Sequence, residues 1–151
     1  MAVTNFFLPQ DICKDAGITT CKFLKLFHLN VRSARSKSDD LMFLFQSFKF
    51  SFDVIMLTET WYRDETDFFI LPQYKHFYQN RLSGRGGGVA MLVARGDFEI
   101  VEEYTLVTDD YEILCVKRNV HMFSVVYRPP SGNTARFFCD SRQSVVLCKR
   151  M

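Results

Sequence analysis

The sequence predicts an α/β protein with a mixed, mainly antiparallel sheet and a flanking helix. Two strand-length apolar runs, residues 22–29 and 54–57, lie on either side of residues 38–48, where apolar side chains recur at helical spacing. Further β-rich runs follow at short intervals, as in an antiparallel meander. Hydrophobic residues make up 48% and charged residues 24% of the 151 residues, which is the balance of a globular protein and the length of one domain.

The first three elements have the length and order of a βαβ unit. The apolar run 22–29 ends at Asn30, Ser38 is a predicted N-cap with two acids after it, and the run 54–57 ends shortly before Glu59. A strand, helix and strand over about 30 residues form a right-handed crossover between parallel strands. Asn30 and Glu59 are therefore expected at the same edge of the sheet.

Glu59 lies at the point where a predicted buried strand leaves the core, two residues before Trp61, the only tryptophan of the chain. Open α/β sheets bind ligands beyond the carboxyl ends of their strands, so a carboxylate there is a candidate ligand or acid–base group. An ordinary surface glutamate is the alternative, and Glu59 taken alone favours that interpretation. The convergence with Asn30 is what argues for a functional site.

The second half of the chain predicts a meander that ends at Tyr127. The glycine-rich residues 81–88 predict a tight hairpin with positive φ, because no Lys-Ser or Lys-Thr pair and no helix follow to make a phosphate loop. Two prolines after Arg128 end the last strand, since proline cannot donate to a ladder. Further strands are expected at residues 74–79, 89–93, 98–101, 111–116 and 120–127.

Composition excludes several classes of protein. A formal charge of +2 is too small to indicate nucleic-acid binding from charge alone. Five cysteines, odd in number and without a CxxC pair, predict reduced thiols in an intracellular protein, nuclear or cytoplasmic. No apolar run approaches the roughly 20 residues of a membrane span, and no signal peptide is evident. We expect a soluble protein that is neither secreted nor bound to a membrane.

Four short motifs, in order, make a specific resemblance. They read LNVRS at residues 29–33, LTETW at 57–61, GRGGGV at 84–89 and VYRPPS at 126–131. Together they resemble the N-terminal half of an endonuclease/exonuclease/phosphatase domain of the kind carried by non-LTR (LINE-like) retrotransposons. The resemblance covers residues 22–138, and it leaves residues 1–21 as a poorly ordered leader and residues 139–151 as an unrelated tail. It implies a four-layer α/β sandwich of two packed sheets flanked by helices.

The resemblance also implies a site and a reaction. Glu59 matches the family's metal-ligand glutamate, Asn30 the asparagine that orients the metal and the scissile phosphate, and Tyr127 the tyrosine whose hydroxyl contacts the phosphate. Members of the family cleave phosphodiesters, so DNA is the implied partner and magnesium, or else manganese, the implied metal. Magnesium is commonly held by only one or two carboxylates plus phosphate and water, which is consistent with these residues.

Four arginines are candidate contacts to nucleic-acid phosphates. They are Arg32, Arg63, Arg85 and Arg128, which all lie in or beside the four motifs. A solvated surface arginine is the alternative interpretation of each.

The chain departs from the family after Tyr127. The family continues with an Asp-x-Asn motif, a further aspartate and a terminal Ser-Asp-His that supplies the base. Here the 24 residues after Tyr127 contain one aspartate, Asp140, and no histidine, and His28, His76 and His121 lie upstream as core or surface residues. We therefore expect a truncated domain that is inactive alone, binds metal weakly if at all, and can self-associate through an uncovered sheet face. The alternative is a non-catalytic nucleic-acid or protein binding module on the same scaffold.

Overall fold

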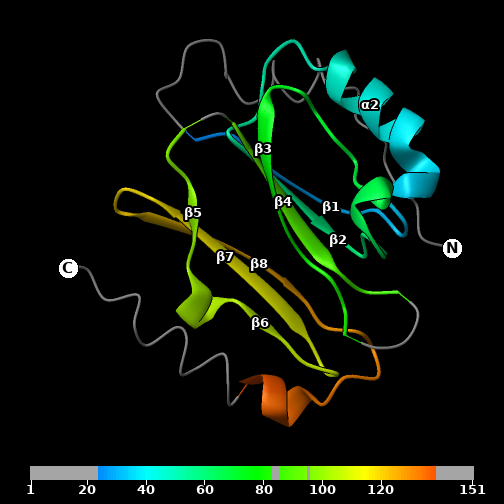
Figure 1. Ribbon diagram of the computed structural model, residues 1–151, viewed down its shortest axis with the longest axis vertical. Helices are drawn as coiled ribbons and strands as arrows, with labels where there is room; N and C mark the ends of the chain where they lie inside the picture. The colour runs from blue at the N-terminus through cyan, green and yellow to red at the C-terminus, as the bar shows by residue number, and fades with distance from the viewer. Residues whose placement is uncertain (1–23, 83–85, 95, 139–151) are drawn as a thin grey trace, which may run out of the picture.

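The computed structural model describes residues 24–82, 86–94 and 96–138, and it contains two four-stranded sheets and one main helical segment (Figure 1). The prediction of a mixed α/β fold is confirmed. The expected leader (1–21) and tail (139–151) lie outside the described residues. The helices in the described part of the chain are too short and too polar to cross a membrane.

The first sheet has the strand order β1-β2-β4-β3 and is mixed. β1 runs parallel to β2, as the βαβ pattern predicts, whereas β4 is antiparallel to both β2 and β3. β2 and β4 are central strands whose apolar runs are buried on both faces, because each is covered by a second layer. The bounds are β1 (Leu26–Asn30), β2 (Val54–Thr58), β3 (Tyr74–Gln79) and β4 (Val89–Ala94).

A helical segment connects β1 to β2 and covers the outer face of the first sheet. A 3-10 turn, η1 (Arg35–Lys37), leads directly into α2 (Ser38–Ser47). The prediction that Ser38 is the N-cap was wrong, because the preceding 3-10 turn already places Ser38 inside the helix and the cap position, Lys37, makes no side-chain cap bond. The helix packs Leu41 and several partly buried aromatic rings onto Ile55 of β2.

The second sheet is antiparallel throughout and is built around β7. β8 pairs with one edge of β7, while β5 and β6 pair with opposite ends of its other edge, on either side of the 3-10 turn η3. β6 was not predicted, and the strand expected at 98–101 pairs over two residues only. The bounds are β5 (Glu99–Ile100), η3 (Glu102–Tyr104), β6 (Leu106–Val107), β7 (Glu112–Arg118) and β8 (His121–Tyr127). A further short 3-10 turn, η2 (Glu65–Asp67), follows β2.

The two sheets pack face to face and share one apolar core. Val54 and Met91 of the first sheet meet Leu114 and Val116 of the second, and all four side chains are inaccessible to solvent. The facing sides of the described strands therefore cover each other. The face between the two sheets is thus covered, and self-association through an uncovered sheet face stays a prediction.

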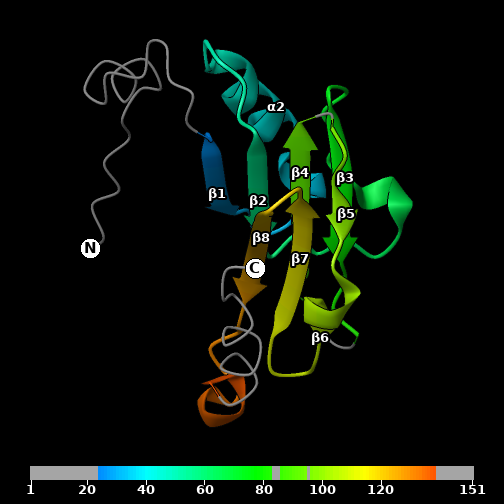
Figure 2. The same cartoon turned by 90° about the vertical axis from the view of Figure 1, so that its left-hand side faces the viewer.

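Two of the edge strands, β1 and β8, lie on the same side of the sandwich (Figure 2). Among the described residues, each of the two strands pairs with a single neighbour. Exposed apolar side chains follow both edges, at Leu24, Leu26, Met122 and Val126. An open edge with unpaired backbone groups and apolar side chains is a template for pairing with another chain. We propose that any self-association of this chain uses these edges.

A lysine on the β8 edge should weaken such association. We expect Met122→Lys to raise the dissociation constant about tenfold, because pairing along β8 would bring the ammonium group out of water. The measurement is sedimentation velocity over a concentration series. The matched control is Val120→Lys, which adds the same charge at a turn residue that is 91% exposed and lies outside the strand. Equal effects of the two substitutions would contradict pairing along β8.

Candidate functional site

The ends of three strands bring Asn30, Glu59 and Tyr127 together, and we call these residues the Glu59 trio. Asn30 is the last residue of β1, Glu59 follows β2, and Tyr127 is the last residue of β8. The Asn30 Nδ2 group donates to Glu59 Oε1 over 2.8 Å, and the Tyr127 hydroxyl donates to the same oxygen over 3.1 Å. One carboxylate oxygen therefore joins the two sheets.

The backbone at Glu59 is held in the left-handed region, with a φ of 54°. Such a conformation costs a non-glycine residue about 1–3 kcal/mol and persists only where the surroundings fix it. Here the segments after β1 and β2 are bonded to each other: Ser33 N–H donates to the Glu59 carbonyl over 2.9 Å, and Ala34 N–H to the Thr60 carbonyl over 3.0 Å. The backbone strain thus lies at Glu59, whose side chain accepts the hydrogen bonds from Asn30 and Tyr127.

The glycine-rich hairpin closes against the same segment. Gly86, Gly87 and Gly88 all have positive φ, as predicted, but residues 80–88 connect β3 to β4, so the connection is longer than the tight hairpin expected. A Cβ at Gly88 would lie 2.6 Å from Thr60 Oγ1, and one at Gly87 would lie 2.7 Å from Glu112 Oε1. Only glycine lets the backbone approach the site this closely.

Electrostatics keep the Tyr127 hydroxyl in its protonated form. Burial raises the pKa of Tyr127, and the neighbouring Glu59 carboxylate raises it further. The hydroxyl is therefore a hydrogen-bond donor at neutral pH, which agrees with its bond to Glu59. Both bonds of the trio use Glu59 Oε1, and among the described residues no donor bonds to Oε2.

The trio offers a limited set of metal ligands. No group of three or more His, Cys, Asp or Glu side chains in the described ranges could hold a metal ion. Glu59 Oε2 and the amide oxygen of Asn30 are hard oxygen donors of the kind that magnesium prefers. They fit one side of a hydrated ion whose other ligands are water and phosphate, and they do not fit a closed protein cage.

A buried ion pair beside the trio was missed by the sequence reasoning. Glu112 is fully buried at the first position of β7, directly opposite Tyr127 in the β7–β8 ladder. Its Oε1 lies 2.8 Å from Arg81 Nε. Burial raises the pKa of Glu112, Arg81 opposes this, and Glu59 adds to it, so the carboxyl groups of Glu59 and Glu112 influence each other.

The four candidate arginines differ in their surroundings. Arg32 and Arg63 are exposed, Arg32 two residues beyond the end of β1 and Arg63 two residues beyond Trp61. The Arg128 guanidinium donates to the carbonyls of Pro129 and Gly132 over 3.1 and 2.8 Å, so it closes the turn after β8. Arg85 lies outside the described residues.

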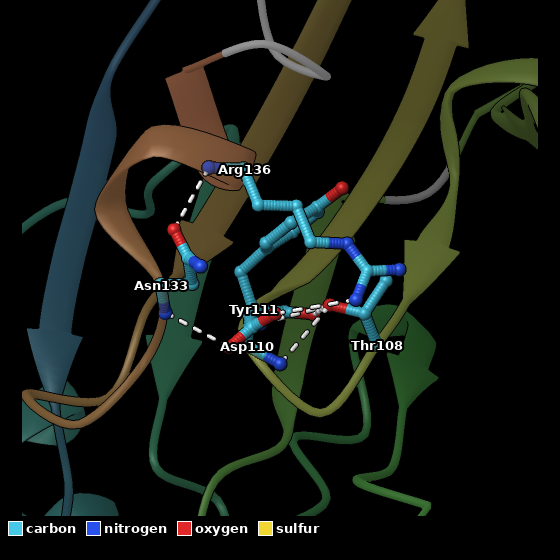
Figure 3. A network of polar contacts seen from close by, with 5 residues as sticks. All are labelled: Thr108, Asp110, Tyr111, Asn133 and Arg136. Atoms are coloured by element: carbon cyan, nitrogen blue, oxygen red, sulfur yellow. Dashed lines mark hydrogen bonds and ion pairs between the residues drawn. The ribbon is translucent and has the colours of Figure 1, made fainter.

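A network of polar contacts anchors the chain just after Tyr127 (Figure 3). Asp110 Oδ1 accepts the Asn133 N–H over 2.8 Å, and the Asn133 side chain in turn accepts the Arg136 N–H over 3.0 Å at the start of a helical turn. On the other side, Thr108 Oγ1 accepts the Asp110 N–H over 3.2 Å. The segments on either side of β7 and β8 are thereby tied together, which fixes the position of Tyr127.

The histidines are core or surface residues, as the sequence predicts. His76 packs among the rings of Tyr62, Phe68 and Tyr78, and burial lowers its pKa to about 4. His28 and His121 are exposed on β1 and β8. Within the described part of the chain, none of the three histidines has a hydrogen bond to the Glu59 trio.

The chain matches no protein-family model, and it matches no curated protein. We therefore infer the function from the geometry of the Glu59 trio and from the four sequence motifs.

Removing Arg81 should lower the stability of the fold, because Glu112 is buried. We expect Arg81→Met to lower the free energy of unfolding by about 3 kcal/mol at neutral pH, because it leaves a buried carboxylate without its partner. Without Arg81, the pKa of Glu112 in the folded state lies further above its value in the unfolded state. Glu112 of the folded variant therefore takes up a proton as the pH falls, and the loss of unfolding free energy is smaller at about pH 5 than at neutral pH. Urea unfolding at the two pH values measures this.

The matched control for this experiment is Lys117→Met. Lys117 pairs with Glu99 over 3.1 Å, but both side chains are largely exposed, so its removal should cost less than about 1 kcal/mol at either pH. A pH-independent loss in Arg81→Met, or one no larger than in the control, would contradict the account of the buried pair.

Proposed function

We propose that this chain supplies part of the active site of a metal-dependent phosphodiester hydrolase that nicks DNA. The proposal includes the endonuclease/exonuclease/phosphatase fold, in which α2 and the two packed sheets would be three of the four layers. The observation that carries the proposal is the double hydrogen bond to Glu59 Oε1, donated by Asn30 and Tyr127 from different sheets. Residues that three separate motifs single out meet at one carboxylate.

Each member of the trio has a role that follows from its chemistry. Glu59 would hold the cation through Oε2, while the two donors fix the orientation of its carboxylate. Tyr127, whose pKa is raised, keeps its single proton, which it donates to Glu59 here and would donate to a phosphate oxygen instead when a substrate is bound. The Asn30 amide can do the same from the end of β1. A bound magnesium ion would polarise the phosphoryl oxygen and stabilise the charge that develops on it.

A base that activates water is not among the described residues of the site. His76 has its pKa lowered to about 4 and is packed among aromatic rings, and Asp140 lies outside the described residues. The Asp-x-Asn and Ser-Asp-His motifs of the family do not occur after Tyr127 in this sequence. Loss of a general base costs about 10²- to 10⁴-fold in rate, so we propose that the chain alone is inactive.

The position of the trio indicates where further residues would join. Asn30 and Tyr127 are the last residues of β1 and β8, and these are the two strands with open edges on the same side of the sandwich. Strands added to these edges would place their ends beside Glu59. The residues that complete the site would therefore come from chain that pairs with β1 and β8.

The alternative is a non-catalytic module that binds nucleic acid or protein. The absence of a group of metal-binding side chains among the described residues favours it, and so do the exposed arginines near Trp61. The two functions differ in one respect: a completed site should nick DNA if the chain is part of a hydrolase, and should only bind DNA or protein if it is a binding module.

Plasmid nicking with magnesium or manganese separates the two functions. We expect no nicking by the chain alone, and nicking when the C-terminal half of a closely related intact domain is added. The restored activity should be lost in Glu59→Gln, Asn30→Ala and Tyr127→Phe, and kept in Glu99→Gln, which removes an exposed carboxylate of β5. Robust nicking by the chain alone would contradict the missing base. A complex of the two halves that binds DNA without nicking it would favour the binding module.

A further inference from the structure

A cavity of about 820 Å³ lies beyond the ends of β1, β2 and β3, and Trp61, two residues after Glu59, is part of its lining. Its volume is within the range of about 300–1,000 Å³ that is usual for ligand sites. We call it the basic pocket, and we define it by the lining residues on which the argument depends: Arg35, Trp61, Arg63, Asp67, Asn80 and Arg81.

The charges of the basic pocket favour an anion. Three arginines face one aspartate, and that aspartate is already engaged: Asp67 accepts from Arg35 Nη1 over 2.7 Å and from the Arg63 N–H over 3.0 Å. Arg35 holds the pKa of Asp67 below its usual range, with the Arg63 N–H second, so Asp67 stays ionised and offsets only one arginine. Arg81 is already paired with Glu112 over 2.8 Å, so among the described lining residues the guanidinium group of Arg63 remains to attract negative charge, and Arg81 adds the unbonded Nη2 group.

Two polar atoms at the pocket are buried without a partner. Arg81 uses Nε for Glu112, but its Nη2 has no hydrogen-bond partner among the described residues. Asn80 Oδ1 likewise has no hydrogen-bond partner among the described residues. A buried donor or acceptor left unpaired costs about 1–3 kcal/mol, so both atoms point to a ligand that offers an acceptor and a donor.

Trp61 forms one wall of the pocket. Its backbone φ is 58°, and its backbone N–H donates to the Gly87 carbonyl over 3.0 Å. A Cβ at Gly86 would lie 3.4 Å from its indole nitrogen. The indole is thus held in place by the glycine hairpin. An aromatic side chain next to arginines is the combination that binds unstacked bases and their phosphates.

The basic pocket and the Glu59 trio share parts of the chain. Trp61 and Arg63 lie two and four residues after Glu59, and Arg81 joins the pocket to Glu112, which pairs with Tyr127 across the β7–β8 ladder. A strand whose phosphodiester lies at Glu59 would therefore pass the pocket with a neighbouring nucleotide.

We propose that the basic pocket binds one unstacked nucleotide of a DNA strand, with its base against Trp61 and its phosphate at Arg63 and Arg81. This inference rests on the proposed function, because the strand is the one that presents its phosphodiester to Glu59. The unpaired Asn80 carbonyl would accept a hydrogen bond from the edge of the base and Arg81 Nη2 would donate to the phosphate.

Trp61 is the only tryptophan of the chain, so its fluorescence reports on the pocket directly. We expect a single-stranded oligonucleotide of about ten nucleotides to quench this fluorescence saturably, in EDTA and without metal. The duplex of the same sequence should bind at least about tenfold more weakly, because it offers no unstacked base. Free dAMP should also bind at least about tenfold more weakly, because it lacks the rest of the strand.

Arg63→Gln should weaken binding of the oligonucleotide about tenfold, since it removes one charged hydrogen bond from an exposed residue. Arg118→Gln is the matched control, because Arg118 is an exposed arginine at the opposite end of β7 from Glu112, and its binding should not change. Equal affinity of Arg63→Gln and the control would overturn the proposal. Binding of dAMP as tight as that of the oligonucleotide would overturn the assignment to a strand.

The same titration with Glu59→Gln separates this inference from the proposed function. Binding that persists in Glu59→Gln and falls in Arg63→Gln supports the pocket even if the completed domain fails to nick DNA. Restored nicking with unchanged binding in Arg63→Gln would leave the proposed function in place and overturn the pocket.

Discussion

The hydrogen bonds to Glu59 Oε1 are the interaction on which the rest of the site depends. Asn30 approaches this oxygen from the first sheet and Tyr127 from the second, so the carboxylate is held where the two sheets end. The positive φ of Glu59 aims its side chain at both donors. The backbone hydrogen bonds from Ser33 and Ala34 and the close packing of the glycine hairpin against Thr60 support this conformation.

The core beneath the site explains why these strand ends can meet. The apolar faces of β2, β4, β7 and β8 fill the space between the sheets and hold the strands at a fixed separation. Polar residues begin where each strand leaves this core, and the buried Arg81–Glu112 pair lies at that boundary. The contacts of Asp110 with Asn133 and Arg136 then keep the segment after β8 from moving away. Packing and polar contacts thus fix the same end of the sandwich.

Much of this arrangement is readable in the sequence, and the rest depends on tertiary contacts. The βαβ pattern allows Asn30 and Glu59 to be predicted as neighbours, whereas Tyr127 joins them only through the resemblance of its motif to the family. β6 pairs over two residues, which is too short to leave a pattern. Nothing local distinguishes the buried Glu112 from an exposed glutamate, because only Arg81, 31 residues earlier, permits its burial. The basic pocket was missed for the same reason, since segments after three different strands form it.

We propose that the Glu59 carboxylate is where this chain binds a divalent cation. Paramagnetic broadening of backbone amide NMR signals by Mn²⁺ tests it most directly, because this measurement detects even weak and transient binding. The account predicts that the signals of Asn30, Glu59 and Tyr127 broaden first and that Glu59→Gln abolishes the effect. Broadening centred on other acidic residues, such as Asp39 and Asp40 in the first turn of α2, or unchanged broadening in Glu59→Gln, would contradict it.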